Sequence, residues 1–373
     1  MDIKEKKKAL NSLIKGLKKS GVIDEDTTCG FGDKVDVSYQ LSPTPFPSLN
    51  TVIGGGFPRG KFTCISGPQG TCKSTLCLHH AAHIQATRPD DVILWLDAEN
   101  SFDLGWAQQI GVDTNNILFV EKMNSLEEYL NAMLRFVDTG NVDVVVIDSI
   151  GGMSPEGEFK TKGDVPRDLR DDTMALQARK FGQWARMATP RVARHNIEVI
   201  MIAQVYSAIT SYGGIWEVKG GNQLKHTTHL RLMTRRSKDE RTATVKMPDG
   251  NKKIVNLGWQ LHIKVDKSRQ SGSEGHEIIL PFRNGAGIVK DEAAVLTALS
   301  FGLIERSGAW YTWKDERIQG KENVIKHFIE NQEHAAQLAQ ELEAWAENDT
   351  IEIAIAHEDT QENCVEETIE VDG

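Results

Sequence analysis

The stretch GPQGTCKST, residues 67–75, is the strongest indication of the fold class because it matches a phosphate-binding loop at every position except one. The usual pattern, G-x-x-x-x-G-K-[ST], has glycine where Cys72 stands. The stretch lies between an expected strand at 62–66 and an apolar helical segment that starts at Ser74. Such a loop holds phosphates with backbone N–H groups at a helix start, a lysine and a hydroxyl. We therefore predict a nucleotide-binding loop; an ordinary glycine-rich turn is the alternative.

The cofactors predicted from this loop are ATP and Mg²⁺. Lys73 is expected to reach the outer phosphates and Ser74 to ligate the metal. A positive φ at Cys72 would cost ~1–2 kcal/mol, so we expect a helical φ there. A thiol at a helix N-terminus beside a lysine is also expected to have a lowered pKa and to react readily. The predicted cofactor-binding residues of the loop are Gly67, Pro68, Gln69, Gly70, Thr71, Cys72, Lys73, Ser74 and Thr75.

Two acidic segments follow apolar strands and strengthen this prediction. VVVIDS places Asp148 at the end of a buried strand, where a carboxylate can hold a Mg²⁺-bound water. LWLDAEN delivers Asp97 and Glu99 to the edge where ligands bind in open α/β sheets. Glu99 is then the candidate to deprotonate the water that attacks the γ-phosphate. Either acidic segment alone could be a helix cap or a solvated loop.

Short β-rich runs alternate with longer helical patterns along most of the chain. Several runs are almost continuously apolar, as strands covered by helices on both faces must be. This alternation predicts an α/β fold with a mostly parallel, twisted sheet. TATVKMPDGNKKIVNL, residues 242–257, predicts a hairpin closed by a Pro-Asp-Gly turn. The predicted strands are 62–66, 91–97, 117–120, 142–148, 197–203, 228–233 and 261–265.

The two ends of the chain differ strongly in charge. Residues 347–373 carry ten acidic residues and no Lys or Arg, whereas the rest of the chain has 43 acidic and 43 basic residues. The tail is expected to be disordered, and either to compete with DNA for basic surface or only to solubilise the protein. Leu10, Leu13, Ile14 and Leu17 predict a basic amphipathic helix that packs on its own domain or docks on a neighbouring subunit or acidic surface.

No apolar run reaches membrane-spanning length, and the five cysteines show no metal-binding pairs. A cytoplasmic protein without a membrane partner is therefore expected. The histidines at 79, 80 and 83 and those at 226 and 229 lack neighbouring carboxylates in the sequence, so structural roles are predicted for them. Trp310, Tyr311 and Trp313 are expected to form the core of a small C-terminal domain, with duplex contact as the second interpretation.

Seven segments together resemble the RecA family of recombinases, in the family's order and approximate spacing. The resemblance runs from the N-terminal helix to about Trp345. The altered loop and DKSR are similar to the phage branch typified by UvsX, whereas GLIERSGAWY is closer to bacterial RecA. The segments are the phosphate loop, LDAENSFD, VVVIDSIGGMSP, MIAQ, GGNQLK, DKSRQ and GLIERSGAWYTWK.

The resemblance implies roles for further residues. Asp103 and Trp106 match positions that contact the adenine base, although the family more often has Tyr than Trp. Gln204 matches the glutamine that senses the γ-phosphate and passes its state to the following loop. Lys267 and Arg269 match cations that a neighbouring subunit inserts against the γ-phosphate, so hydrolysis would require assembly. The implied catalytic residues are Glu99, Lys73, Gln204, Lys267 and Arg269.

Two segments, at about 154–172 and 205–221, fall where the family's DNA-binding loops lie. Their acidic residues offset most of their basic ones, so charge alone would not predict DNA binding. Aromatic side chains for stacking and glycines for close approach are present in the second segment. The candidate DNA-binding residues are Lys160, Lys162, Arg167, Tyr206, Tyr212, Trp216, Lys219, Gly220 and Gly221.

The resemblance implies a DNA-dependent ATPase that forms a filament on single-stranded DNA and promotes homologous pairing and strand exchange in recombination and repair. The implied partners are single-stranded DNA, homologous duplex DNA, further copies of the chain, and single-strand-binding and loading proteins. Two alternatives remain open: a ring-forming helicase or motor on the same core fold, and a DNA filament protein that binds ATP without turnover. The expected organisation is an N-terminal polymerisation helix at 1–35, a RecA-like P-loop ATPase core at 36–285, a small α+β domain at 286–346, and the tail at 347–373.

Overall fold

The computed structural model describes residues 2–24, 27–31, 39–159, 174–210, 213–218, 221–246, 252–270 and 273–349. The chain divides into two units, Met1–Gln40 and Leu41–Gly373. No helix in these ranges is long and apolar enough to cross a membrane.

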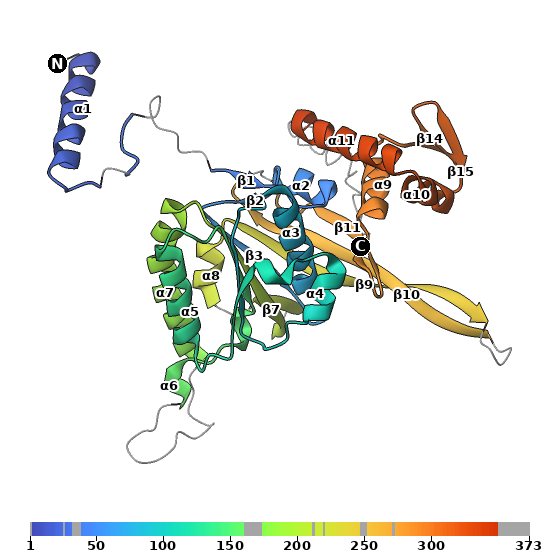
Figure 1. The fold of residues 1–373 in the computed structure, drawn as a ribbon, viewed down its shortest axis with the longest axis horizontal. Helices are drawn as coiled ribbons and strands as arrows, with labels where there is room; N and C mark the ends of the chain where they lie inside the picture. The colour runs from blue at the N-terminus through green and yellow to red at the C-terminus, as the bar shows by residue number, and fades with distance from the viewer. Residues whose placement is uncertain are drawn as a thin grey trace, which may run out of the picture. The chain divides into compact units, whose positions relative to one another are not determined.

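A ten-stranded sheet forms the centre of the larger unit (Figure 1). Its strand order is β12-β11-β10-β9-β3-β7-β6-β4-β5, and β8 pairs with β7. The six strands from β9 to β5 run parallel, which confirms the predicted mostly parallel core, and β10 to β12 extend it antiparallel. The strands are β3 (Phe62–Gly67), β4 (Ile93–Asp97), β5 (Ile117–Glu121), β6 (Val144–Asp148), β7 (Glu198–Thr210), β8 (Gly213–Val218), β9 (Leu230–Lys246), β10 (Lys252–Ser268), β11 (Glu277–Arg283) and β12 (Gly287–Ile288).

Helices cover both faces of the parallel strands, which is why those strands are apolar throughout. Successive strand residues point to opposite faces, so Val144 and Val146 join one core while Val145 and Ile147 join the other. On the first face lie α2 (Pro47–Ile53), α3 (Lys73–Thr87) and α4 (Leu104–Ile110), and on the second lie α5 (Leu126–Asp138) and α7 (Met174–Arg194) (Figure 1). Shorter elements are β1 (Leu41–Ser42), β2 (Phe57–Pro58), η2 (Thr114–Asn116), η3 (Ile150–Gly152), α6 (Glu156–Phe159) and α8 (Gly221–Thr227).

Two segments contain more strand than the sequence predicted. The predicted hairpin at 242–257 exists, but its arms continue the sheet strands β9 and β10, and its Pro-Asp-Gly turn lies outside the described residues. The segment 205–221, expected as a loop, is mostly a hairpin, since β7 runs on to Thr210 and pairs with β8 from Val205↔Val218 to Thr210↔Gly213. Cross-strand pairing, which local sequence does not reveal, decides both cases.

The C-terminal part packs α9 (Lys290–Ser300), α10 (Lys321–Glu330) and α11 (Gln332–Asp349) against a three-stranded antiparallel sheet. Tyr311 and Trp313 are buried in its core, as predicted. Trp310 is not: 37% of it is exposed, and the guanidinium of Arg317 lies over its ring. Since side chains alternate along a strand, Trp310 cannot share the inward face of Tyr311. The three strands are β13 (Glu305–Ser307), β14 (Trp310–Trp313) and β15 (Glu316–Gln319).

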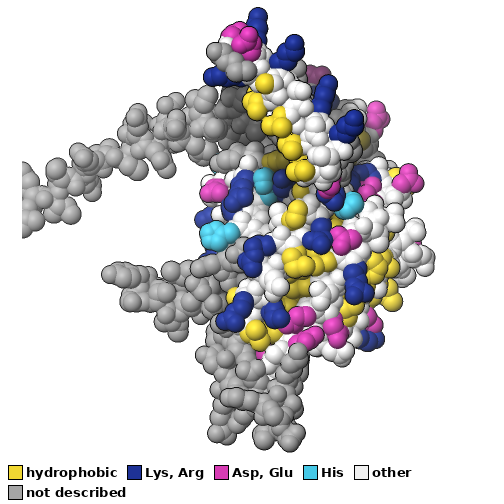
Figure 2. All heavy atoms as spheres, turned by 90° about the vertical axis from the view of Figure 1, so that its left-hand side faces the viewer, with side chains coloured by type: hydrophobic (Ala, Val, Ile, Leu, Met, Phe, Trp, Pro, Cys, Tyr) yellow, Lys and Arg dark blue, Asp and Glu magenta, His cyan; other side chains and the backbone are white. Residues whose placement is uncertain are grey.

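The smaller unit contains α1 (Ile3–Lys19), which confirms the predicted N-terminal helix. Asp2 caps its first turn by accepting a hydrogen bond from the backbone N–H of Ile3, and Lys18 and Lys19 lie at its C-terminal end, where cations are favourable. None of its residues is buried, and about half of Leu10 and Leu13 is exposed. Figure 2 shows hydrophobic side chains in a row along this helix with Lys side chains beside them.

Candidate active site

The site lies at the edge of the sheet where parallel strands β3, β4, β6 and β7 meet. The register places Gly67 opposite Gln204 and Asp97 opposite Asp148. Four segments that are distant in the sequence therefore deliver their polar residues to one edge, as expected for a ligand site of an open α/β sheet.

The loop between β3 and α3 closes on itself through hydrogen bonds. Thr71 Oγ1 lies 2.8 Å from the carbonyl oxygen of Pro68 and 2.7 Å from Thr234 Oγ1. A Cβ on Gly67 would lie 2.2 Å from Thr234 Oγ1, so β9 packs against the loop too closely for any side chain. Thr234 was not identified from the sequence, because only the pairing of β9 with β3 brings it here.

The expectation of a helical φ at Cys72 is wrong. Cys72 has φ 57° and ψ 28°, the left-handed conformation, and it is the residue directly before α3. Gly70 is also left-handed, with φ 72°. The loop thus keeps the backbone that glycine normally provides and bears the strain of a Cβ atom, because the fixed ends of β3 and α3 determine its path.

The expectation of a reactive Cys72 thiolate is also contradicted. Burial raises the pKa of the Cys72 thiol to about 12 and outweighs the opposite effects of a hydrogen bond with Thr75 and the charges of Arg236 and Lys73. At neutral pH the thiol is therefore protonated and a poor nucleophile.

Lys73 supplies the positive charge of the loop. Its Nζ donates hydrogen bonds to the carbonyl oxygens of Gly67, at 3.1 Å, and Pro68, at 2.8 Å. Burial lowers the pKa of the Lys73 ammonium, whereas the nearby carboxylates of Asp148 and Glu99 raise it. An ammonium held inside the loop by two carbonyls is well placed to meet a phosphate.

Ser74 and Asp148 form the candidate Mg²⁺ site. The Ser74 hydroxyl hydrogen-bonds to the buried Asp148 carboxyl group. Burial raises the pKa of Asp148 to about 6, the neighbouring Glu99 and Asp97 add to this, and Ser74 and Lys73 oppose it. Oxygen donors suit Mg²⁺, and a divalent cation would neutralise this crowded group of carboxylates, so the residues fit the ion.

Glu99 stands between two hydrogen-bond donors. Gln204 Nε2 lies 2.8 Å from Glu99 Oε1, and the Ser149 hydroxyl donates to the same oxygen. The structure thus joins the predicted base to the predicted phosphate sensor directly. Ser149 was missed, although it follows Asp148 in the sequence, because nothing local shows that it faces Glu99.

Asp97 organises the loop that carries Glu99. Its buried carboxylate accepts hydrogen bonds from the backbone N–H groups of Glu99, Ser101 and Phe102, at 3.2, 2.8 and 2.9 Å. These bonds use much of its acceptor capacity. Asp97 therefore positions Glu99.

Asp103 and Trp106 lie on the first turn of α4. Asp103 Oδ1 accepts a hydrogen bond from the backbone N–H of Trp106, at 3.0 Å, and so caps the helix. The indole Nε1 of Trp106 donates to Thr75 Oγ1 at 3.2 Å, which ties this turn to the phosphate loop. The structure thus brings both predicted adenine contacts next to the loop.

Lys267 and Arg269 lie away from the phosphate loop of their own chain. Lys267 Nζ donates to the carbonyl oxygens of Lys225, at 2.7 Å, and Thr228, at 2.8 Å, and Arg269 donates to the carbonyl of His226. These carbonyls lie at and just beyond the C-terminal end of α8, where cations are favourable.

The register shows how far apart these groups are. Lys267 pairs with Arg231, which pairs with Cys64 on β3. Gly67 lies three residues further along β3, about 10 Å, and β10 is two strands away, about 10 Å sideways. The two cations are therefore not brought together with Lys73, Asp148 and Glu99 within one chain.

The candidate DNA-binding residues are only partly placed. Lys160, Lys162, Arg167, Tyr212, Lys219 and Gly220 lie outside the described residues. Tyr206 is in β7 and pairs with Glu217, Trp216 is in β8 and pairs with Ser207, and Gly221 begins α8. The hairpin therefore starts directly after Gln204.

Two of the histidines predicted to be structural, His79 and His80, have side-chain partners in the fold. His79 Nε2 accepts a hydrogen bond from the backbone N–H of Ile288 at 3.0 Å. His80 Nε2 lies 2.6 Å from the fully buried Glu198 Oε1. These two side chains thus connect the helix α3 to the strands β12 and β7.

Two family models match the sequence over most of its length. The RecA N-terminal domain matches residues 8–273, and the RecA C-terminal domain matches residues 295–346. The chain belongs to the RecA family. RecA proteins are similar throughout: that of Macrococcus caseolyticus strain JCSC5402 is 30% identical over 342 residues, covering 91% of this chain and 90% of the relative. That of Staphylococcus aureus strain JH9 is 29% identical over 337 residues, covering 88% and 89%.

Because it belongs to this family, the chain is a RecA-type recombinase with roles in DNA recombination and repair. Matches to both RecA domains support this function over the ring-forming helicase and the non-hydrolysing filament protein. The RecA family implies a DNA-dependent ATPase that uses ATP with Mg²⁺, binds single-stranded DNA and forms filaments of its own subunits.

Proposed function

We propose that this chain hydrolyses ATP at a site shared by neighbouring subunits of a filament on single-stranded DNA, and that this cycle drives homologous pairing and strand exchange. One observation carries the shared site. Lys267 and Arg269 contact the C-terminal end of α8, two strands away from β3 and level with the middle of that strand, not with the phosphate loop that follows its end. A role at the γ-phosphate would therefore need a second copy of the chain.

Within one subunit the residues divide into four groups of roles. The backbone of the loop from Gly67 to Thr71, together with Lys73 and Thr75, would hold the phosphates, and Asp103 and Trp106 the base. Ser74 and Asp148 would hold Mg²⁺, which when bound neutralises phosphate charge. Glu99 would orient the attacking water and accept its proton.

Gln204 would connect nucleotide state to DNA binding. It contacts Glu99 through its side chain, and the β7–β8 hairpin begins at the next residue. A γ-phosphate that draws Gln204 away from Glu99 would also move the base of this hairpin. The coupling would therefore act on strands that are already paired with each other.

Filament formation would use α1. Its exposed apolar row offers a surface for a neighbouring subunit, as an amphipathic helix laid in a groove does. Head-to-tail contacts of this kind generate a helical filament where the rotation between subunits does not close a ring.

Strand exchange itself needs little driving force. Replacing one strand by an identical one makes a stacking step, worth ~1.4 kcal/mol, for each one lost. The filament must therefore hold single-stranded DNA open for pairing, and ATP hydrolysis must allow release of the product. Two points stay predictions. One is the set of further partners, which are homologous duplex DNA and single-strand-binding and loading proteins, and the other is a cytoplasmic location.

The test measures ATP hydrolysis with and without single-stranded DNA for Glu99→Ala, Lys267→Ala and their mixture. Each variant alone should be nearly inactive. In an equal mixture, about a quarter of head-to-tail interfaces combine an intact Glu99 with an intact Lys267, so about a quarter of wild-type activity should return. Lys264→Ala, an exposed lysine of the same strand, is the matched control and should remain active.

A mixture no more active than its components would contradict a shared site. Hydrolysis by the wild type that ignores DNA would contradict the coupling to DNA.

A further inference from the structure

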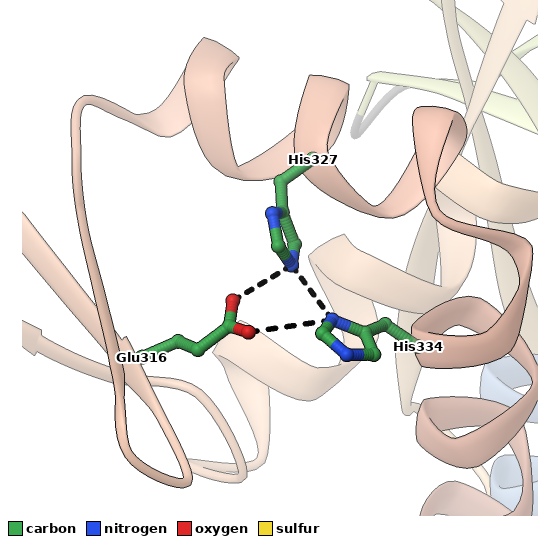
Figure 3. A group of neighbouring side chains, drawn as sticks. All are labelled: Glu316, His327 and His334. Carbon is green, nitrogen blue, oxygen red and sulfur yellow. Dashed lines mark hydrogen bonds and ion pairs between the residues drawn. The ribbon is translucent and has the colours of Figure 1, made fainter.

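A group of metal-ligand side chains lies in the C-terminal domain, away from the phosphate loop. Glu316 begins β15, His327 is in the last turn of α10, and His334 is in the first turns of α11 (Figure 3). The helices are joined at Asn331, whose side chain accepts a hydrogen bond from the backbone N–H of His334. The corner between the helices thus turns both imidazoles toward the β14–β15 hairpin.

The three side chains converge on one point. His327 Nε2 lies 2.9 Å from Glu316 Oε2 and 2.9 Å from His334 Nδ1, and His334 Nδ1 lies 3.7 Å from Glu316 Oε1. Zinc–ligand bonds of ~2.0–2.1 Å at tetrahedral angles separate ligand atoms by about 3.3 Å. The observed separations lie on both sides of this value, so small adjustments would place all three atoms around one ion.

Hydrogen bonds alone satisfy this arrangement poorly. His327 Nε2 carries at most one proton, yet it has two partners at the same distance. If both facing nitrogens carried protons, two donors would stand 2.9 Å apart. A cation removes the conflict, since both imidazoles and the carboxylate can then donate lone pairs to it.

The side chains around Glu316, His327 and His334 are compatible with a bound Zn²⁺ ion. Trp313 lies 5.1 Å from the ring of His334, and Phe328 lies 5.3 Å from the ring of His327, so the core supports both rings. About a quarter of each histidine side chain is exposed, which leaves a path for the ion and room for water. Imidazole favours Zn²⁺ over Mg²⁺ and Ca²⁺, which prefer oxygen ligands.

We propose that Glu316, His327 and His334 bind one Zn²⁺ ion, with water completing the coordination. Such an ion would join the β14–β15 hairpin to the α10–α11 corner and stabilise the C-terminal domain. This zinc site is separate from the candidate nucleotide-binding site, and its proposal does not depend on the proposed ATP hydrolysis.

The test is zinc stoichiometry of the full-length protein after equilibrium dialysis against Zn²⁺ with Mg²⁺ in excess and no nucleotide. The wild type should retain one equivalent more than His327→Ala, His334→Ala and Glu316→Gln. Loss of a supporting group outside the ligand shell already weakens zinc binding about 10- to 100-fold, so loss of a ligand should cost at least as much. Zn²⁺ should also raise the melting temperature of the wild type but not that of the variants.

His262→Ala is the matched control. His262 and Glu277 form an even shorter pair at 2.6 Å, and among the described residues they are not part of a three-ligand group, so the loss of His262 should leave the bound zinc unchanged. Glu316→Gln preserves side-chain shape and keeps the test decisive if a histidine variant does not fold. Equal zinc content in the wild type and Glu316→Gln, without a zinc-dependent melting shift in the wild type, would overturn the proposal and leave a hydrogen-bonded cluster only.

Discussion

Replacing Cys72 tests the strain that the structure assigns to the phosphate loop. With φ at 57°, a side chain costs ~1–2 kcal/mol, and Cys72→Ala keeps that cost while removing the sulfur. Cys72→Gly removes the cost but loses ~0.5–1 kcal/mol to the greater freedom of glycine in the unfolded chain. Cys72→Gly should therefore be about 0.5–1 kcal/mol more stable than Cys72→Ala, a difference of ~1–2 °C in melting temperature for a domain of this size.

Gly70→Ala provides the matched control for this comparison. Gly70 has φ 72°, and a Cβ there would meet nothing within 4 Å, so the substitution adds backbone strain without a clash. It should destabilise the wild type by the same ~0.5–1 kcal/mol. Scanning calorimetry of the four proteins measures both effects. If Gly70→Ala shows the loss while Cys72→Gly is no more stable than Cys72→Ala, the left-handed assignment at Cys72 is refuted.

Three further predictions concern two buried histidines, His80 and His79, and the coupling of ATP to DNA binding through Gln204. His80→Ala leaves the buried Glu198 carboxylate without its closest partner and should destabilise the protein by about 3–5 kcal/mol, part of which Glu198→Gln in the same background should restore in denaturation experiments. Burial, with the charge of Lys290 as a smaller cause, lowers the pKa of His79 from 6.5 to about 4. As the pH falls, His79 therefore takes up a proton in the unfolded chain before it does so in the folded chain. The stability of the protein should then fall as the pH drops from 6.5 toward 4. From pH 7 to pH 5 the wild type should lose about 2 kcal/mol that His79→Gln does not lose; parallel curves for the two proteins would contradict this. Gln204→Ala should abolish the increase in single-stranded DNA affinity caused by ATP without removing ATP binding, and retention of that increase would show that Gln204 does not couple the two sites.

Features that depend on short stretches of chain could be predicted from the sequence. A strand, a glycine-containing turn, Lys-Ser and a helix predict the phosphate loop, and the apolar runs that end in Asp97 and Asp148 predict buried parallel strands with acids at one edge. Periods of two and of about 3.6 residues are local properties, so they can be read without a fold.

Contacts between residues that are distant in the sequence became visible only in the folded chain. In the folded chain, Cys72 has a left-handed backbone conformation, and Ser149 and Gln204 both donate to one oxygen of Glu99. Lys267 lies far from its own phosphate loop. The fold also brings two histidines and a glutamate together at the corner of the C-terminal helices. Each of these outcomes depends on strand register or on the packing of separate elements, and nothing in the local pattern of residues specifies either.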